Sequence, residues 1–187
     1  MRMLALSLSL ALSAGVVLTP APALAAATPI ECIYAGLDKG QNWDLTVKVV
    51  KQGIRSESNI EEEQVNRIGE QVMRCRKRYG WGKAREDAAL RYFVGRVLVK
   101  DATDHLHDYG FSFAILKEVV DALYESDRAT FATGSAQPQI VTKVIGMLKE
   151  KGVNVDGVAE GDRTMFGQMV GQAVVGLAMQ QKAEADY

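Results

Sequence analysis

Hydrophobic residues recur every three or four positions along most of this chain, which is the spacing that places them on one face of an α-helix. The clearest case is residues 58–79, whose apolar stripe consists of Val65, Ile68, Val72, Cys75 and Tyr79. Ser58 and Glu61 have the spacing of a capping box, and Gly80 follows where a helix commonly stops. Acidic residues occupy the first turns and basic residues the last, as the helix dipole favours. The pattern therefore predicts one long helix.

The same period indicates helices elsewhere. They are expected over residues 28–40, 43–54, 83–109, 112–126, 138–151 and 162–180. For residues 43–51 the pattern is ambiguous, because a strand-like alternation at Leu45, Val47 and Val49 competes with a helical face that includes Val50. We interpret this segment as a helix, since no second strand is evident to pair with it.

Together these elements predict an all-α fold. We expect a single-domain bundle of about six to seven helices over residues 26–180, followed by a frayed tail at residues 181–187. The composition agrees, because aromatic residues make up only 7 % of the chain while helix-favouring Ala, Leu, Glu, Lys and Arg are frequent. No internal repeat or low-complexity linker indicates a second domain.

The first residues have the pattern of a secretory signal peptide. Arg2 supplies a positive start, an apolar run extends from Leu4 to Leu18, and Ala23 and Ala25 match the small residues of a cleavage site. We therefore expect residues 1–25 to be removed near Ala25 and the protein to be periplasmic or secreted. No later stretch is long and apolar enough to predict a membrane span.

The chain has two cysteines, Cys32 and Cys75. In an exported protein an even pair indicates one disulfide, here closing a loop of about 44 residues. Two buried free thiols, or one reactive cysteine with a histidine base, are the alternatives. The apolar stripe of residues 58–79 turns Cys75 toward the core, where Cys32 can meet it.

The stretch "DATDHLHDYG" holds both histidines of the chain. On a helix His105 and His107 point about 200° apart, so they cannot bind one ion together. Asp101, Asp104 and Asp108 share one side, and His105 lies one turn from two of them. The row predicts a solvated acidic helix end, an internal salt-bridge network, or a metal or general-base site. In the last case Asp104 and His105 are the candidate catalytic residues, and the candidate metal ligands are Asp101, Asp104, His105 and Asp108.

A second catalytic candidate is Glu125. With Ser126 it is expected to close the helix over residues 112–126, and the two resemble the catalytic Glu-Ser pair of lytic transglycosylases, in which the glutamate is a general acid. The resemblance covers these two residues. The Gly-Leu-Met-Gln block that the family carries downstream is absent, and "GSAQPQ" stands in its place. The alternative interpretation is an ordinary helix end.

Positive charge is concentrated in one segment. From Arg67 to Lys100 there are ten Lys or Arg residues and three acidic ones, which gives +7, while the rest of residues 26–187 carries −9. Such a segment predicts either internal pairing with the acidic remainder or a surface for an anionic partner. The candidate binding residues are Arg67, Arg74, Lys77, Arg78, Arg85 and Arg91.

The last predicted helix contains three glycines. Gly167 and Gly171 have the G-x-x-x-G spacing of closely packed helices, and Gly176 follows. About 15 apolar residues interrupted by Gln168 and Gln172 are too short and too polar to span a membrane. We expect close packing inside the bundle, with a partner-binding or membrane-surface helix as the alternative.

These observations predict an exported, non-catalytic helical binding protein of the bacterial envelope, of an inhibitor or immunity type. Its expected partner is another protein or an anionic envelope component, and we expect no cofactor. One alternative is a small metal-dependent or general acid–base hydrolase that uses the aspartate row. Another is a binder of anionic glycan or lipid through Arg67–Lys100. Nucleic acid is disfavoured by export, by a net charge of −1 and by the lack of a binding motif.

Overall fold

The computed structural model describes residues 28–37, 42–135 and 137–187, so the signal peptide expected over residues 1–25 lies outside the described residues. Within them the chain forms eight α-helices, three short 3₁₀ helices and no β-strand, which confirms the all-α fold. The α-helices are α1 (Cys32–Leu37), α2 (Trp43–Lys51), α3 (Asn59–Tyr79), α4 (Lys83–Leu106), α5 (Phe113–Asp121), α6 (Glu125–Ala132), α7 (Pro138–Glu150) and α8 (Arg163–Asp186). The 3₁₀ helices are η1 (Pro29–Glu31), η2 (His107–Tyr109) and η3 (Glu160–Asp162).

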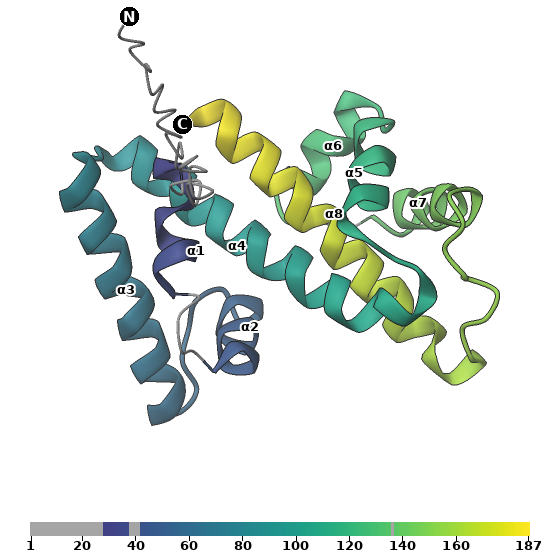
Figure 1. Ribbon diagram of the computed structural model, residues 1–187, viewed down its shortest axis with the longest axis horizontal. Helices are drawn as coiled ribbons and strands as arrows, with labels where there is room; N and C mark the ends of the chain where they lie inside the picture. Colours follow the sequence, from purple (N-terminus) through teal and green to yellow (C-terminus); the bar gives the residue numbers. More distant parts are fainter. Residues whose placement is uncertain (1–27, 38–41, 136) are drawn as a thin grey trace, which may run out of the picture.

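Helices α4 and α8 form the axis of the bundle. They run side by side in opposite directions, with α1, α2 and α3 on one side of the pair and α5, α6 and α7 on the other (Figure 1). A Cβ atom added at Gly95 of α4 would lie 2.3 Å from the carbonyl oxygen of Gly176 in α8. The two glycines therefore permit a close approach of the backbones. A Cβ at Gly167 would meet nothing within 4 Å, so this part of the expected G-x-x-x-G pair makes no such contact.

The apolar side chains form two clusters on either side of this axis. The first is built around Ile33, Ile68 and Phe93 and belongs mainly to helices α1–α4. The second, around Leu116 and Phe131, belongs mainly to α4–α8. Leu98 is packed against both clusters. The axis helices thus carry one half of the core on each side.

A disulfide between Cys32 and Cys75 fastens α1 to α3, as the cysteine count predicts. The two Cα atoms lie 6.0 Å apart, and 43 positions separate the residues in the sequence. In the chain-entropy model, closing a loop of this size stabilises the folded state by about 4 kcal/mol. Because α3 packs mainly on α1 and α2 and makes few contacts with α4, the disulfide adds a covalent link to the packing of this outer helix.

The segment whose pattern was ambiguous is helical. Asn42 caps α2 by accepting a hydrogen bond of 3.1 Å from the N–H of Leu45 through Oδ1. Val47, Val49 and Val50 are buried against the neighbouring helices. The interpretation of residues 43–51 as a helix is therefore confirmed.

Two expected boundaries are wrong. The helix predicted over residues 112–126 is two helices, because α5 ends at Asp121 and Tyr124 has an extended backbone that begins α6. The turn between them buries Leu123. The tail expected to fray from residue 181 instead continues α8 to Asp186. Tyr187 is fixed there, since its hydroxyl accepts a 2.6 Å hydrogen bond from the indole N–H of Trp81.

Candidate functional site

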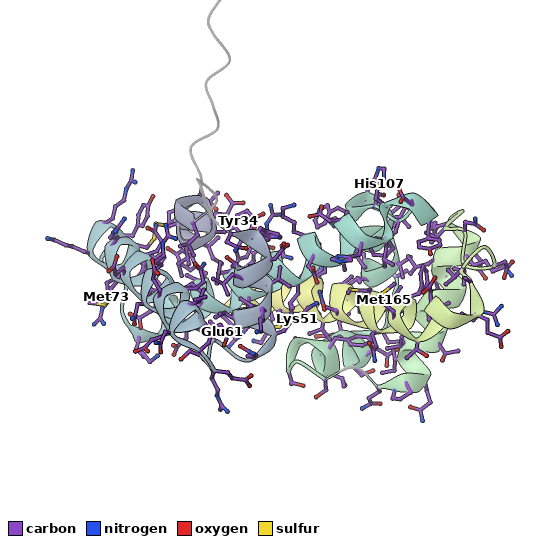
Figure 2. The ribbon with its side chains drawn as sticks, turned by 90° about the horizontal axis from the view of Figure 1, so that it is seen from below. Tyr34, Lys51, Glu61, Met73, His107 and Met165 are labelled. Carbon is purple, nitrogen blue, oxygen red and sulfur yellow. A yellow bond between two sulfur atoms is a disulfide. The ribbon has the colours of Figure 1, made fainter. Side chains whose placement is uncertain are left out.

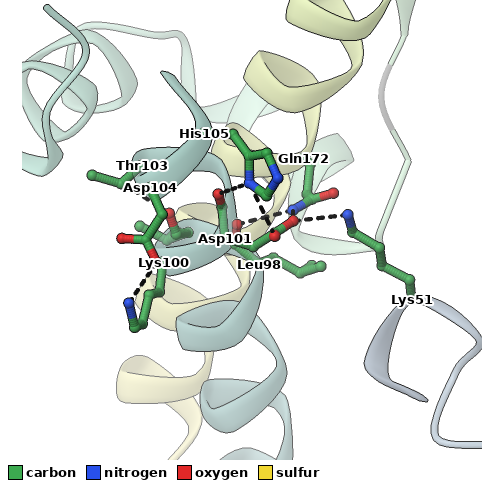
Figure 3. Close-up of polar contacts among 9 residues, drawn as sticks. Lys51, Leu98, Lys100, Asp101, Thr103, Asp104, His105 and Gln172 are labelled. Carbon is green, nitrogen blue, oxygen red and sulfur yellow. Dashed lines mark hydrogen bonds and ion pairs between the residues drawn. The ribbon is translucent and has the colours of Figure 1, made fainter. Parts of the chain in front are cut away.

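The aspartate row does not converge, because its first member is turned into the bundle. Asp101 is buried, and its Oδ2 accepts from Nε2 of Gln172 at 2.6 Å and lies 2.8 Å from Nζ of Lys51 (Figure 3). Nδ1 of His105 is 2.8 Å from the carbonyl oxygen of Asp101 and 3.3 Å from its carboxylate. A buried carboxylate costs several kcal/mol unless such partners surround it. This arrangement joins α2, α4 and α8, as an internal salt-bridge network would.

The other two aspartates face elsewhere. Asp104 lies on another side of α4 and pairs with Lys100 at 2.5 Å (Figure 3). The side chain of Asp108 is 99 % exposed, and its Oδ1 lies 3.5 Å from Nδ1 of His107. Among the residues that the structure describes, no group of three or more His, Cys, Asp or Glu side chains is placed to hold a metal ion. The proposed metal or general-base set is thus not assembled at one point.

Glu125 lies beside Ala178 and Gln181 of α8. It is the first residue of α6 and is exposed, so it begins a helix and does not close one as the sequence pattern indicated. A general acid of the glycosidase type needs a second carboxylate and a sheltered position that raises its pKa. The exposed start of α6 does not supply that shelter.

In the basic segment from Arg67 to Lys100, the acidic residues pair with cations of the same segment. Arg74 pairs with Glu70, Arg76 with Glu86 and Lys83 with Asp87. This accounts for all three acidic residues of the segment. Within the described residues, two of its cations pair with acids outside the segment, namely Arg91 with Asp186 and Lys100 with Asp104. Internal pairing with the acidic remainder therefore neutralises a small part of the excess charge.

Four of the six candidate binding residues carry no ion pair within the described part of the chain. They are Arg67, Lys77, Arg78 and Arg85, all exposed. Two of them, Lys77 and Arg78, occupy the last turn of α3, and Arg85 lies in the first turn of α4. The sharp bend at Gly80, where φ is +63°, brings these turns together. Arg67 lies nearer the start of α3, and Arg91 pairs with Asp186 near the end of α8.

An aromatic cluster fills the corner between these cations. Tyr79 stacks on Trp81 with ring centroids 5.9 Å apart, and Trp81 meets the edge of Tyr187 at 6.2 Å. The guanidinium of Arg78 lies 5.4 Å from the Tyr79 centroid, and that of Arg85 lies 5.7 Å from the Tyr187 centroid. Stacking on a ring holds an arginine in place without neutralising it. We call Arg74, Lys77, Arg78 and Arg85 with these three rings the basic corner.

The surface of the basic corner is hollowed and partly apolar. A shallow depression of about 520 Å³ is lined by Met73, Arg76, Lys77, Gly80 and Trp81. Met73 is 59 % exposed, which is unusual for a large apolar side chain, and it lies at the outer edge of the molecule (Figure 2). A flexible thioether beside guanidinium groups is suited to an adaptable contact surface.

Sequence reasoning found the cations of this corner but missed its rings. Trp81 and Tyr187 are 106 positions apart, and the tail that carries Tyr187 was expected to fray. The excess of positive charge over residues 67–100 was the only available signal. No protein-family model, no curated protein and no solved structure matches this chain.

Proposed function

We propose that this protein is an exported, non-catalytic binding protein of the bacterial envelope whose basic corner binds an acidic surface of another protein. Export is inferred from the signal-peptide pattern of residues 1–25. The observation that carries the proposal is the set of exposed cations without acidic partners in the described residues, gathered where α3 meets α4. An inhibitor or immunity role is the form of binding that the size favours, together with an aspartate row that does not converge in the described residues.

The charge of the corner supports an anionic partner. Because Lys77, Arg78 and Arg85 are exposed and form no ion pair with the described residues, an incoming carboxylate need not displace one there. Arginine also presents several N–H donors in a plane that matches the two oxygens of a carboxylate. Complementary charge of this kind raises the association rate and selects the partner.

The composition of the corner favours a protein over a glycan. Protein interfaces are enriched in Arg, Tyr, Trp and Met relative to the rest of the surface. The corner combines arginines with the exposed Met73 and the partly exposed Tyr79 and Tyr187. An interface of this composition gains apolar contact as well as charge pairing. A sulfated or phosphorylated glycan would make less use of the apolar contact.

The corner is also held rigid before binding. Cys75, whose disulfide reaches α1, lies next to Arg74 and within one turn of Lys77 and Arg78. The hydrogen bond from Trp81 to Tyr187 fixes the α3–α4 bend against the end of α8. A preorganised surface loses less conformational entropy on binding and so binds more tightly for the same contacts.

Binding to immobilised poly-L-glutamate tests this proposal. The variant Lys77→Glu/Arg78→Glu should bind at least about tenfold more weakly at low salt than the unchanged protein. The matched control is Arg55→Glu/Arg163→Glu, which changes the net charge equally at two exposed positions outside the corner. Circular dichroism should show both variants folded, since all four side chains are exposed.

Two outcomes would overturn the proposal. In the first, both double variants lose binding to the same extent, which would reduce the effect to net charge. In the second, the unchanged protein is retained on heparin and not on poly-L-glutamate, which would assign the corner to an anionic glycan. We expect the unchanged protein to be retained on poly-L-glutamate. This retention should weaken steeply with salt and should depend on the corner residues.

A further inference from the structure

A second hollow lies beside α4 and shares no residue with the basic corner. Its volume is about 330 Å³, at the lower end of the volumes of small-molecule sites in proteins. The lining includes Tyr34 of α1, Arg96, Lys100, Thr103 and Asp104 of α4, and Phe113 of α5. Arg96, Lys100 and Thr103 follow one another at helical spacing, so they share one face of α4.

Arg96 is a half-buried cation that has no acid in contact with it. Within the described part of the chain it forms no ion pair and no hydrogen bond, and its guanidinium lies 4.9 Å from the ring centroid of Tyr34. Its charge acts on Glu31 at longer range, but the carboxylate of Glu31 accepts hydrogen bonds from Thr28 and Tyr92 instead. Stacking on a ring leaves the N–H groups of a guanidinium without an acceptor. The donors of Arg96 are therefore free to bind an acceptor in the hollow.

The charges around the hollow favour a ligand with one negative charge. Lys100 lies one turn from Arg96 and pairs with Asp104 at 2.5 Å, so these two side chains balance each other (Figure 3). Among the described residues that line the hollow, the charge of Arg96 is left over. A guanidinium presents parallel N–H donors that match the two oxygens of a carboxylate. A monocarboxylate fits this arrangement better than a divalent anion such as phosphate.

Two aromatic rings also line the hollow. Phe113 is 40 % exposed, so a large apolar surface there is open to a ligand. The ring of Tyr34 is held by the guanidinium of Arg96 and by an edge contact with Trp43, whose ring centroid is 5.9 Å away. Contacts between aromatic rings stabilise a complex beyond the burial of their apolar area. An aromatic ligand can therefore use the charge of Arg96 and the exposed ring of Phe113 together.

We propose that this hollow binds a small aromatic monocarboxylate, with the carboxylate at Arg96 and the ring system against Phe113. Seven residues separate Arg96 from Thr103, which is about 10 Å along α4 at the usual rise per residue. Two fused rings span such a hollow better than one. This activity goes beyond the acidic-protein binding proposed above and does not depend on it, because the two sites use different residues.

Ligand-observed NMR with 2-naphthoate tests the proposal. The unchanged protein should bind it at one site with a Kd of about 0.1 mM or below. The uncharged amide 2-naphthamide has the same rings and should bind at least about tenfold more weakly. Arg96→Gln should weaken the binding of naphthoate at least about tenfold and leave that of naphthamide unchanged. Phe113→Ala should weaken the binding of both ligands, because both contact the ring.

Matched controls separate the hollow from general effects. Arg78→Gln is the control for Arg96→Gln, because the guanidinium of Arg78 also lies over a tyrosine ring, at 5.4 Å. Tyr124→Ala is the control for Phe113→Ala, because Tyr124 is another exposed aromatic residue and does not line the hollow. Both control variants should bind naphthoate as the unchanged protein does, and so should the corner variant Lys77→Glu/Arg78→Glu.

The proposal fails if 2-naphthoate does not bind at about 1 mM, if naphthoate and naphthamide bind equally, or if Arg78→Gln weakens binding as much as Arg96→Gln. Tighter binding of glucuronate, which has a carboxylate and no aromatic ring, would assign the hollow to an acidic sugar instead. If Arg96→Gln does not fold, Arg96→Lys replaces it. That variant keeps the charge and loses the planar donors, so it should also weaken the binding of naphthoate and not that of naphthamide.

Discussion

The carboxylate of Glu61 has two partners, Lys48 and Glu57, that its capping-box spacing does not predict. Its side chain, labelled in Figure 2, is 2 % exposed and pairs with Lys48. Nζ of Lys48 is 2.6 Å from Oε1, and the backbone N–H of Glu57 donates to Oε2 at 2.6 Å. The hydrogen bond from Lys48 and then that from Glu57 lower the pKa of Glu61 below 4.5. The ionised form is therefore favoured in the folded state.

This shift predicts a pH dependence. Because the folded pKa of Glu61 lies below its unfolded value, the carboxylate stabilises the fold fully above pH 4.5, and this contribution is lost as the pH falls through the folded pKa. Glu61→Gln should lower the melting temperature at pH 7 and have a smaller effect at progressively lower pH. Thermal unfolding of both proteins between pH 3 and 7 measures this. A difference between them that stays constant or grows on acidification would contradict the assignment.

Some contacts between residues could be predicted from the sequence, and others could not. The disulfide followed from the even count of cysteines and from the inward position of Cys75 on its helix. The partners of Asp101 did not, because Lys51 and Gln172 are 50 and 71 positions away and helical spacing says nothing about contacts between helices. Spacing placed Asp101 beside Asp104 and Asp108, whereas the packing of α8 turned it inward.

Among the elements, the pair α4 and α8 depends most on two small residues. A Cβ at Gly176 would lie 2.8 Å from the carbonyl oxygen of Gly95, which is closer than real Cβ contacts. Backbone atoms cannot move aside as a flexible side chain can. Substitution here must therefore separate the two helices that carry both halves of the core.

Gly95→Ala should lower the free energy of unfolding by about 1–3 kcal/mol through overpacking, measured by urea denaturation. Gly167→Ala is the matched control in α8, where an added methyl meets nothing within 4 Å. In that case the better helix propensity of alanine should raise stability by up to about 1 kcal/mol. Equal effects of the two substitutions would show that the close approach of α4 and α8 is not as described.

Sequence periodicity located the long helices but not every boundary. Residues 58–79 had a cap, a stop and a clear stripe, and α3 matches them within one residue. The sequence pattern does not predict the break between α5 and α6, because Ala122 and Leu123 are both compatible with a continuous helix. The end of α8 escaped because the polar residues after 180 suggest fraying, while Ala183 is buried and Tyr187 is anchored by Trp81.

For the whole molecule, the described helices gather the exposed cations of distant turns at one end of the bundle. The basic corner lies at the end of the axis pair where α3 meets α4 and where α8 ends (Figure 1). None of the described helices is long and apolar enough to cross a membrane. Charge segregation could be read from the sequence because it is a property of composition. The aromatic cluster of the corner could not, since Trp81 and Tyr187 are 106 positions apart.

Photo-crosslinking in cells tests most directly whether the basic corner binds another protein. A photoreactive phenylalanine replaces Met73 in the corner or, as a control, Met165 on α8, another exposed methionine toward the far end of the bundle (Figure 2). We predict an adduct with an acidic envelope protein from position 73 only, which disappears when Lys77→Glu/Arg78→Glu is added. The proposal is contradicted if position 73 gives no adduct, or if its adduct persists in the charge-reversed variant.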